Sequence, residues 1–580
     1  MDISVSSVRL DHLGLPAVMA REIGFVDELD ALAGVDSRET LSFGQTVLAM
    51  VHNALGFTSK PLYMSPEFFK RRDLKFLLGV SKTQPDLALT PAHLNEHKLG
   101  RTLDRIAELG PDRVFLKVAA RAFRQQNVKV PQIHLDTTTH SFHGRYEDED
   151  GNPKGADFAP LAPESAADGM VEVFLTKGYS KDYRLHCKQV VHELLVSGDG
   201  DVPLLFKAHS GNAADVVVMR ERMDNLKRCL AAAGADDLMP KLLVADCKLY
   251  SKDTLLHAAR EGTRWVTRVP DTVSEVSQCI ESALRGRGLW KASQSDKRVS
   301  FQAFDLTKWD IAQSYIVVRT ESSKARIEKA MPKRLKNDVE TAEKRLRALR
   351  KTSFACLPDL EAAVRAAFDG ARYLVFDSFT HDVVSTRRGP GRPRKDEHPG
   401  ETIDSFHLAE VSYKEDKEAL RKDELESACF VIATNANVEE MSTEEVLSAY
   451  LKEQQGVERG FRFLKDPQYF CDAFFLKNPS RVVALLCVMT LALLLHSLLQ
   501  RSLRMKIEET NETVPDQKGK PSKTPTIRWV NQKFEGLDVV KVREPHKTWF
   551  KYETLDDFIT TVLRILGPPY VERYSPAWVT

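Results

Sequence analysis

Three acidic residues lie at positions from which a fold could bring them together. Asp136 lies in the alternating segment "VPQIHLDTTTHSFHG", Asp246 ends the short apolar segment "KLLVAD", and Glu458 lies in a charged helical segment. Mg²⁺ binds one or two carboxylates together with substrate phosphates. Two such ions about 3.5–4 Å apart activate the attacking oxygen and stabilise the leaving oxygen of a phosphoryl transfer. The strand–strand–helix order of the three acids therefore indicates a candidate two-metal site, because rigid elements can hold carboxylates accurately.

The helical segment around Glu458 begins at Tyr450 and reads "YLKEQQGVERGFRFLKDPQYF". At about 100° per residue, four of its side chains share an arc of about 80°: Tyr450, Gln454, Glu458 and Lys465. The apolar side chains on or beside that arc are Val457, Phe461 and Leu464. We expect this stripe to face the core, with the two charged side chains directed inward. The alternative is an ion pair at the rim of an ordinary surface helix, where such pairs contribute little.

The elements that must position these acids change character along the chain. Residues 1–128 have the apolar spacing of helices, and residues 129–295 alternate strand and helix patterns, as a mixed α/β layer does. Residues 296–438 contain hairpin strands around a charged helical arm and are too long for a loop, so we expect a β-rich inserted subdomain. The α/β layer should resume in residues 439–505. Residues 506–580 should form a linker and a C-terminal tail, with some short structure in the last fifty residues.

The composition is that of an ordinary globular protein, with 42% hydrophobic and 28% charged residues in 580 and a net charge of +1. Nucleic-acid contact would therefore depend on local basic patches rather than on the overall field. The eight cysteines are scattered without a CxxC pair, which is typical of a reducing cytosol and argues against a zinc ribbon. The histidines around Asp136 also lack a second pair with zinc-ligand spacing: His134, His140 and His143. The mixed, polar N-terminus has no signal-peptide pattern.

The most apolar run extends from Val482 to Leu495 and is interrupted only by Thr490. It is shorter than the roughly twenty residues that a bilayer crossing needs. Because the helical pattern continues past the flanking charges, we expect a buried core helix and no membrane span.

A second basic feature lies in the segment "STRRGPGRPRKDEHPG", where proline and glycine exclude both helix and ladder. An extended basic segment of this kind suits the narrow minor groove of A·T-rich DNA, and a solvated hairpin tip is the alternative. The candidate DNA contacts here are Arg387, Arg388, Arg392, Arg394 and Lys395.

Several blocks of the chain resemble the DDE transposases of bacterial insertion sequences. "IHLDTTTHSFHG", "GYSKDYRLHCKQVV", "FKAHSGNAAD" and "VADCKLYS" are similar to successive family blocks, and "GVERGFRFLKDP" has the Glu-x6-Lys spacing in register with them. The resemblance is to the IS-four superfamily, with its Tyr-Arg-Glu-Lys signature, and most of all to its IS-sixteen-thirty-four branch. The chain departs from the signature at Leu451, where tyrosine is usual, and at Gln454, where arginine is common.

The resemblance implies an α/β fold with an RNase H-like catalytic core, formed by a mixed sheet flanked by helices. It also implies that a β-rich insertion subdomain interrupts this core and that an all-helical N-terminal domain precedes it. Asp136, Asp246 and Glu458 would be the catalytic residues and the ligands of two Mg²⁺ ions, with Mn²⁺ as a substitute. The enzyme would cleave DNA at the ends of its element and transfer the freed 3′-OH into target DNA.

The partners that the resemblance implies are double-stranded DNA, as terminal inverted repeats and as target, and a second copy of the chain in a dimer on that DNA. Lys465 would contact a phosphate near the cut, and further DNA contacts would come from Tyr450, Gln454 and Arg462. The N-terminal helices are a candidate for end binding or dimerisation. The expected location is the bacterial cytoplasm, with the nucleoid when bound to DNA. Two other functions stay open: a decayed copy that only binds DNA, and an RNase H-like nuclease without strand transfer.

Overall fold

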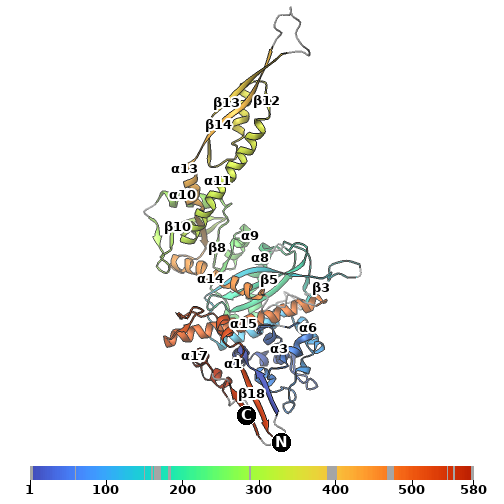
Figure 1. Cartoon of the computed structure of the whole chain (residues 1–580). Helices are drawn as coiled ribbons and strands as arrows, with labels where there is room; N and C mark the ends of the chain where they lie inside the picture. The colour runs from blue at the N-terminus through green and yellow to red at the C-terminus, as the bar shows by residue number, and fades with distance from the viewer. Residues whose placement is uncertain are drawn as a thin grey trace, which may run out of the picture. The chain divides into compact units, whose positions relative to one another are not determined.

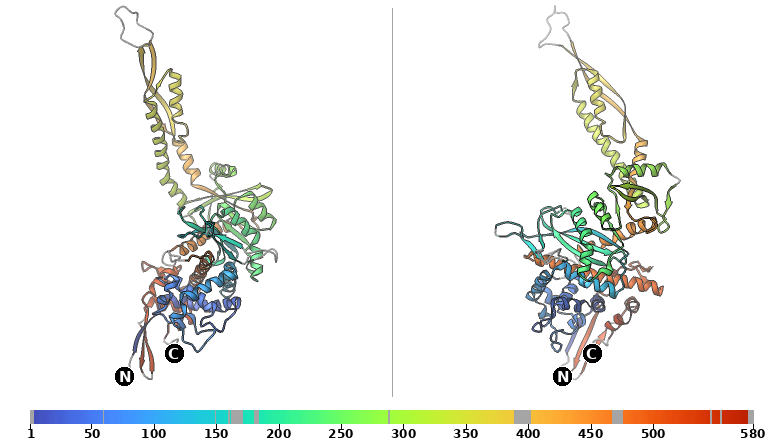
Figure 2. Two further views of the ribbon diagram at one scale, coloured as in Figure 1. Left: turned by 90° about the vertical axis from the view of Figure 1, so that its right-hand side faces the viewer. Right: turned by 180° about the vertical axis from the view of Figure 1, so that it is seen from behind.

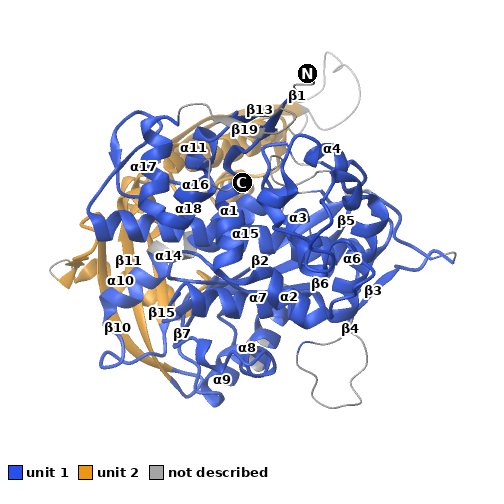
Figure 3. Ribbon diagram, turned by 90° about the horizontal axis from the view of Figure 1, so that it is seen from below, with its two compact units in different colours: residues 1–267, 308–311, 434–580 blue, residues 268–307, 312–433 orange. Residues whose placement is uncertain are grey.

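The computed structural model describes most of the chain in two compact units. The described residues are 4–58, 60–148, 150–158, 161, 171–179, 184–286, 289–387, 402–466, 476–544, 547–552 and 555–575. Unit 1 contains residues 1–267, 308–311 and 434–580, and unit 2 contains residues 268–307 and 312–433 (Figure 3). The three expected carboxylates all belong to unit 1.

A mixed sheet lies at the centre of unit 1, with the strand order β6-β5-β2-β7-β8. Its strands are β2 (Gln132–Phe142), β5 (Lys188–Ser197), β6 (Pro203–Ser210), β7 (Leu242–Ala245) and β8 (Trp265–Arg268). Strands β2, β5 and β6 form an antiparallel meander, whereas β7 pairs parallel with both β2 and β8. Helix α8 (Asp215–Ala232) connects β6 toward β7, and α9 (Lys252–Arg260) connects β7 to β8. The expectation of a mixed α/β fold is confirmed.

The N-terminal part of unit 1 is built from helices, as its apolar spacing predicts. They are α1 (Gly14–Glu22), α2 (Phe25–Ala33), α3 (Phe43–Leu55), α4 (Ser65–Phe69), α5 (Leu74–Leu78), α6 (Glu96–Leu109) and α7 (Pro111–Gln125). Helix α15 (Pro479–Thr510) contacts α1, α3, α6 and α7, and it also contacts β6 and α14 (Thr443–Leu464). In Figures 1 and 2 this orange-red helix runs between the blue N-terminal helices and the sheet. These helices therefore share their core with the rest of unit 1.

Helix α15 contains the apolar run from Val482 to Leu495. Among the described residues it is the one helix with the length and composition of a membrane span, but 89% of its most apolar 18-residue window is buried inside the protein. Neighbouring helices and the sheet thus cover the apolar side chains that would otherwise need lipid. The run forms a core helix, as its length predicts.

The C-terminal segment forms short helices and strands after the region expected to be a linker. It forms α16 (Ile527–Lys533), β18 (Asp538–Glu544), β19 (Lys547–Tyr552), α17 (Asp557–Leu566) and α18 (Pro568–Arg573). Strand β1 (Ser4–Arg9) pairs antiparallel with β18, so a three-stranded sheet β1-β18-β19 joins the two ends of the chain. The N-terminal segment therefore includes a strand beside its helices. Val539 and Val542 are buried, and β-branched residues suit such a strand.

Unit 2 combines strands with a long helix, in the region where an inserted subdomain with a helical arm is expected. The elements of its first part are α10 (Ser274–Arg285), β9 (Lys291–Ala292), β10 (Val299–Lys308), β11 (Ile311–Thr320), α13 (Lys417–Ser427) and β15 (Cys429–Thr434). The arm consists of α11 (Glu321–Leu349), β12 (Ser353–Phe354), α12 (Leu357–Ala366), β13 (Leu374–Arg387) and β14 (Thr402–Glu415). Leu346, Leu360 and Leu408 belong to a core between these helices and the hairpin, which lie side by side in Figures 1 and 2.

A fully buried ion pair fixes α8 against the sheet of unit 1. Glu193 on β5 accepts hydrogen bonds from Arg222 on α8 (2.5 Å) and from His209 on β6 (2.7 Å). Burial alone would raise the pKa of Glu193, but Arg222 and His209 hold it well below its usual range. Because this pKa is depressed in the folded protein, the pair stabilises the fold above the ordinary carboxyl pKa, and that contribution is lost as the pH falls below it.

Arg222→Met should therefore destabilise unit 1 by about 3–5 kcal/mol, because it leaves an uncompensated carboxylate in the interior. Chemical unfolding of the full chain measures this change. Arg105→Met, which removes an exposed Arg105–Glu108 pair, is the matched control and should change stability by less than about 1 kcal/mol. The double variant Glu193→Gln/Arg222→Met should regain much of the loss. An Arg222→Met variant as stable as the parent would contradict the stabilising role of the Glu193–Arg222 pair.

Candidate active site

Asp136 lies on β2, and Asp246 directly follows β7, the neighbouring strand of the sheet. The parallel pairing of the two strands ends with Leu135 opposite Ala245, so each aspartate is the next residue in the chain. Opposite residues of paired strands share a face of the sheet. If the register is extended by one residue beyond its last pair, Asp246 is opposite Asp136, and both aspartates are partly exposed.

Helix α14 (Thr443–Leu464) covers the face on which Asp136 lies. Leu194 is opposite Asp136 in the β2–β5 ladder, and it lies against Gly460 of this helix. Two residues further along β5, and so on the same face, the ring of His192 contacts the ring of Phe461, with centroids 6.0 Å apart. The helix also contacts β7. Glu458 is thus carried on the helix that packs over both aspartate strands.

Two glycines allow α14 to lie close to its neighbours. A Cβ added at Gly460 would be 3.3 Å from Leu194 and from Leu493 of α15, and one at Gly456 would be 2.1 Å from the carboxylate of Asp201. Arg459 donates to that same carboxylate at 2.6 Å, which anchors the helix at the turn between β5 and β6. Sequence reasoning missed these glycines. Their spacing of four in "QQGVERG" is the signal that could have found them, because glycine permits close approach.

The helical stripe is buried only in part, which corrects the expectation for its charged residues. Tyr450, Val457 and Phe461 are buried, but Glu458 is exposed and Lys465 is half-buried. The reason is angular: the apolar side chains define the direction of the core, and Glu458 lies about 100° from Val457, at the edge of the stripe. Gln454 belongs to the helix, and its side chain lies outside the described residues.

Local hydrogen bonds orient both aspartates. The carboxylate of Asp136 accepts from the backbone N–H of Thr137 at 2.7 Å, and that of Asp246 accepts from the N–H of Lys248 at 3.0 Å. Thr267 on β8 donates to the carbonyl oxygen of Asp246 at 2.6 Å, so the turn after β7 is tied to the next strand. Within the described ranges, no three His, Cys, Asp or Glu side chains converge closely enough to hold one metal ion.

The histidines near Asp136 form a buried polar pair beside α14. His140 on β2 and His192 on β5 are joined by a hydrogen bond of 3.1 Å between Nε2 and Nδ1. Burial, together with the positive charge of Lys465, lowers the pKa of His140 to about 3. Lys465 is therefore close to the face of the sheet that carries the aspartates. His134 is also buried, and His143 lies near the thiol of Cys187 at 3.9 Å.

The other expected DNA contacts are distributed over both units. Arg462 is exposed on α14. Arg387 is the last residue of β13 in unit 2. The rest of the basic segment lies outside the described residues: Arg388, Arg392, Arg394 and Lys395.

Comparison with known proteins identifies the family. A family model described as "Transposase DDE domain" matches residues 168–495, which include Asp246 and Glu458 and begin after Asp136. A model described as a domain of unknown function, DUF4277, matches residues 5–120. No curated protein matches the chain. Among solved structures, the chain is similar to a piggyBac transposase in its synaptic complex with hairpin DNA, seen by cryo-EM, with 7% identity, a TM-score of 0.33, and coverage of 99% of this chain and 85% of that one.

The first of these matches spans more than half of the 580 residues. The chain therefore belongs to the transposase DDE family, and it is a DDE transposase, a metal-dependent polynucleotidyl transferase.

Proposed function

We propose that the protein cleaves DNA at the ends of an insertion sequence in an Mg²⁺-dependent reaction and joins the freed 3′-OH to target DNA. Asp136, Asp246 and Glu458 are the proposed metal ligands and catalytic residues. The observation that carries the proposal is the β2–β7 register, in which the two aspartates follow the last paired residues, Leu135 and Ala245. Helix α14, which carries Glu458, packs over both strands.

The donor set fits divalent metal chemistry. Mg²⁺ commonly uses one or two carboxylates and completes its shell with water and substrate phosphates, so two adjacent aspartates suffice in the absence of DNA. The exposed Glu458 can complete the site when substrate is present. The ions would supply activation of the attacking oxygen and charge stabilisation at the leaving oxygen.

The residues of the chain itself have positioning roles in this proposal. The hydrogen bonds from Thr137 and Lys248 hold the aspartate carboxylates in place. Lys465, near the same face of the sheet, neutralises a phosphate beside the scissile bond. The antiparallel meander β2-β5-β6, followed by the parallel strands β7 and β8 with their intervening helices, supports an RNase H-like core.

The proposal extends to the family branch, the partners, the DNA contacts and the location of the protein. The Glu-x6-Lys spacing of Glu458 and Lys465, in register with the other blocks that resemble the family, supports a proposed place in the IS-four superfamily and its IS-sixteen-thirty-four branch. The proposed partners are terminal inverted repeats, target DNA and a second copy of the chain. Tyr450, Gln454 and Arg462 on α14, and the basic segment from Arg387 to Lys395, are proposed DNA contacts. The proposed location is the bacterial cytoplasm, where the protein would act on DNA.

Glu458→Gln should lower the rate of nicking by more than about 100-fold. Loss of a residue that only hydrogen-bonds to a metal ligand lowers activity about 10–100-fold, and loss of a ligand itself should have a larger effect. The assay uses purified full-length protein, Mg²⁺ and DNA carrying the ends of the native element. Because Glu458 is exposed, the variant should fold. Glu439→Gln, an exposed acid before α14, is the matched control. Nicking by Glu458→Gln at the parental rate would remove this residue from the site.

Lys465→Ala should weaken binding of DNA ends and reduce the salt dependence of binding by about one unit of slope, as expected for one lost phosphate contact. Binding titrations at several salt concentrations measure the slope. Lys477→Ala, which changes an exposed lysine beyond α14, should leave the slope unchanged. An unchanged slope for the Lys465 variant would show that this ammonium group does not contact a phosphate.

The two alternative functions make different predictions for the parental protein. A decayed copy would bind the ends and cleave them in neither Mg²⁺ nor Mn²⁺. A nuclease without strand transfer would cleave the ends and give no joined product with a plasmid target. We expect cleavage that stops on chelation of the metal, resumes when Mg²⁺ or Mn²⁺ is added back, and yields joined product.

A further inference from the structure

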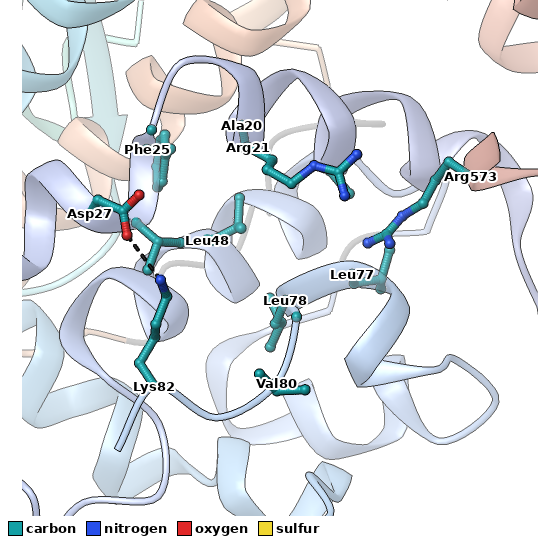
Figure 4. A pocket seen from close by; sticks show the side chains of 14 residues that line it. Ala20, Arg21, Phe25, Asp27, Leu48, Leu77, Leu78, Val80, Lys82 and Arg573 are labelled. Atoms are coloured by element: carbon teal, nitrogen blue, oxygen red, sulfur yellow. Dashed lines mark hydrogen bonds and ion pairs between the residues drawn. The ribbon is translucent and has the colours of Figure 1, made fainter. Parts of the chain in front are cut away.

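A cavity lies among the N-terminal helices of unit 1, apart from the carboxylate site. Its volume is about 280 Å³, and it is closed on one side by Arg573 of the C-terminal helix α18 (Figure 4). Most of its wall is apolar and comes from α1, α2, α3 and α5: Ala17, Ala20, Phe25, Leu48, Leu77 and Leu78. A pocket of this size admits a compact organic group rather than a polymer.

Two guanidinium groups meet at this cavity without a carboxylate partner. Figure 4 shows Arg21 of α1 and Arg573 extending toward each other. The acid in the lining, Asp27, is paired with Lys82 at 3.0 Å. No carboxylate in the part of the chain that the structure describes forms an ion pair with either arginine. The lining therefore has a net excess of two positive charges, three cations against one carboxylate.

The surroundings of Arg573 disfavour its positive charge. Its Nε is buried and has no hydrogen-bond partner among the described residues, and its guanidinium lies 4.5 Å from the centre of the Phe76 ring. Burial, and then the charge of Arg21, lower the pKa of Arg573 to about 10. Like charges brought together in a partly buried site are destabilising unless an anion joins them.

We propose that this cavity binds a small organic oxyanion, a phosphate or carboxylate group on a compact apolar body. The two guanidinium groups would hold the oxyanion, for which their planar donors are suited. The apolar wall would cover the body of the ligand. The site thus gives the N-terminal domain a ligand-binding function separate from DNA cleavage.

The test uses the full-length protein, with phenyl phosphate and benzoate as probes for the two anionic groups and benzyl alcohol as the neutral control. Calorimetry should detect binding of at least one anionic probe and none of benzyl alcohol. Whichever probe binds more tightly identifies the oxyanion, and inorganic phosphate should bind more weakly than phenyl phosphate. Arg21→Gln should weaken probe binding by about tenfold or more, the effect of one lost charge-assisted hydrogen bond.

Arg21 is exposed, so its variant keeps the test independent of folding, whereas Arg573→Gln gives a second reading. Arg573→Gln should lose probe binding without lowering the melting temperature of the free protein, because it removes a repelling charge. Arg101→Gln, an exposed arginine outside the cavity, should bind like the parent. The proposal is overturned if both anionic probes bind the parent more weakly than about 1 mM, or if Arg21→Gln binds them as tightly as the parent. DNA binding lost in both arginine variants without any probe binding would instead make the pair a DNA contact.

Discussion

The parallel pairing of β2 with β7 is the constraint on which the catalytic account depends. It fixes residues more than a hundred positions apart in the sequence, Leu135 and Ala245, as neighbours. Asp136 and Asp246 are the residues that directly follow this last pair. A shift of one residue in either strand would send one carboxylate to the opposite face. Two carboxylates brought close together repel each other, so this register must be stabilised by the surrounding strand pairing and core. The same repulsion would favour binding of a cation between the two carboxylates.

The two faces of this sheet are specialised. The face that carries Asp136 is covered by α14, which the glycines at 456 and 460 allow to approach closely. The opposite face buries Glu193, whose neighbour across the β2–β5 ladder is Thr137. Its pairing with Arg222 holds α8 against the sheet. On one side of the sheet, Asp136 and Asp246 are thus partly accessible to solvent and substrate. On the opposite face, the buried Glu193–Arg222 pair holds α8, and loss of either partner would leave an unpaired buried charge.

The sequence predicts the local parts of this arrangement well. Alternation around Asp136, the apolar run before Asp246 and the helical spacing near Glu458 each depend on neighbouring residues, and each element forms where it is expected. The exposure of Glu458 could not be predicted from the same spacing. The spacing places Glu458 within an arc of about 80°, but it does not say which part of that arc faces the core. That direction is decided by the positions of β5 and α15. The pairing of β1 with β18, across more than 500 residues, is likewise invisible to local patterns.

The position of Glu193 within an apolar strand is a further signal, for a buried ion pair, that sequence reasoning missed. Glu193 lies in "VVHELLV", where a buried acid requires a cationic partner, but nothing in the sequence points to Arg222 rather than another arginine. The converging pair Arg21 and Arg573 is more than 500 residues apart in the sequence, because the last helix completes a cavity formed by the first ones.

The most direct test of the account is the position of Mn²⁺, located by anomalous scattering, in crystals of the full chain with DNA carrying the ends of its element. We expect Mn²⁺ in direct contact with the carboxylates of Asp136 and Asp246, with Glu458 turned from solvent toward the same site. Mn²⁺ bound elsewhere on the protein, or aspartates that contact no metal while DNA lies against α14, would contradict it.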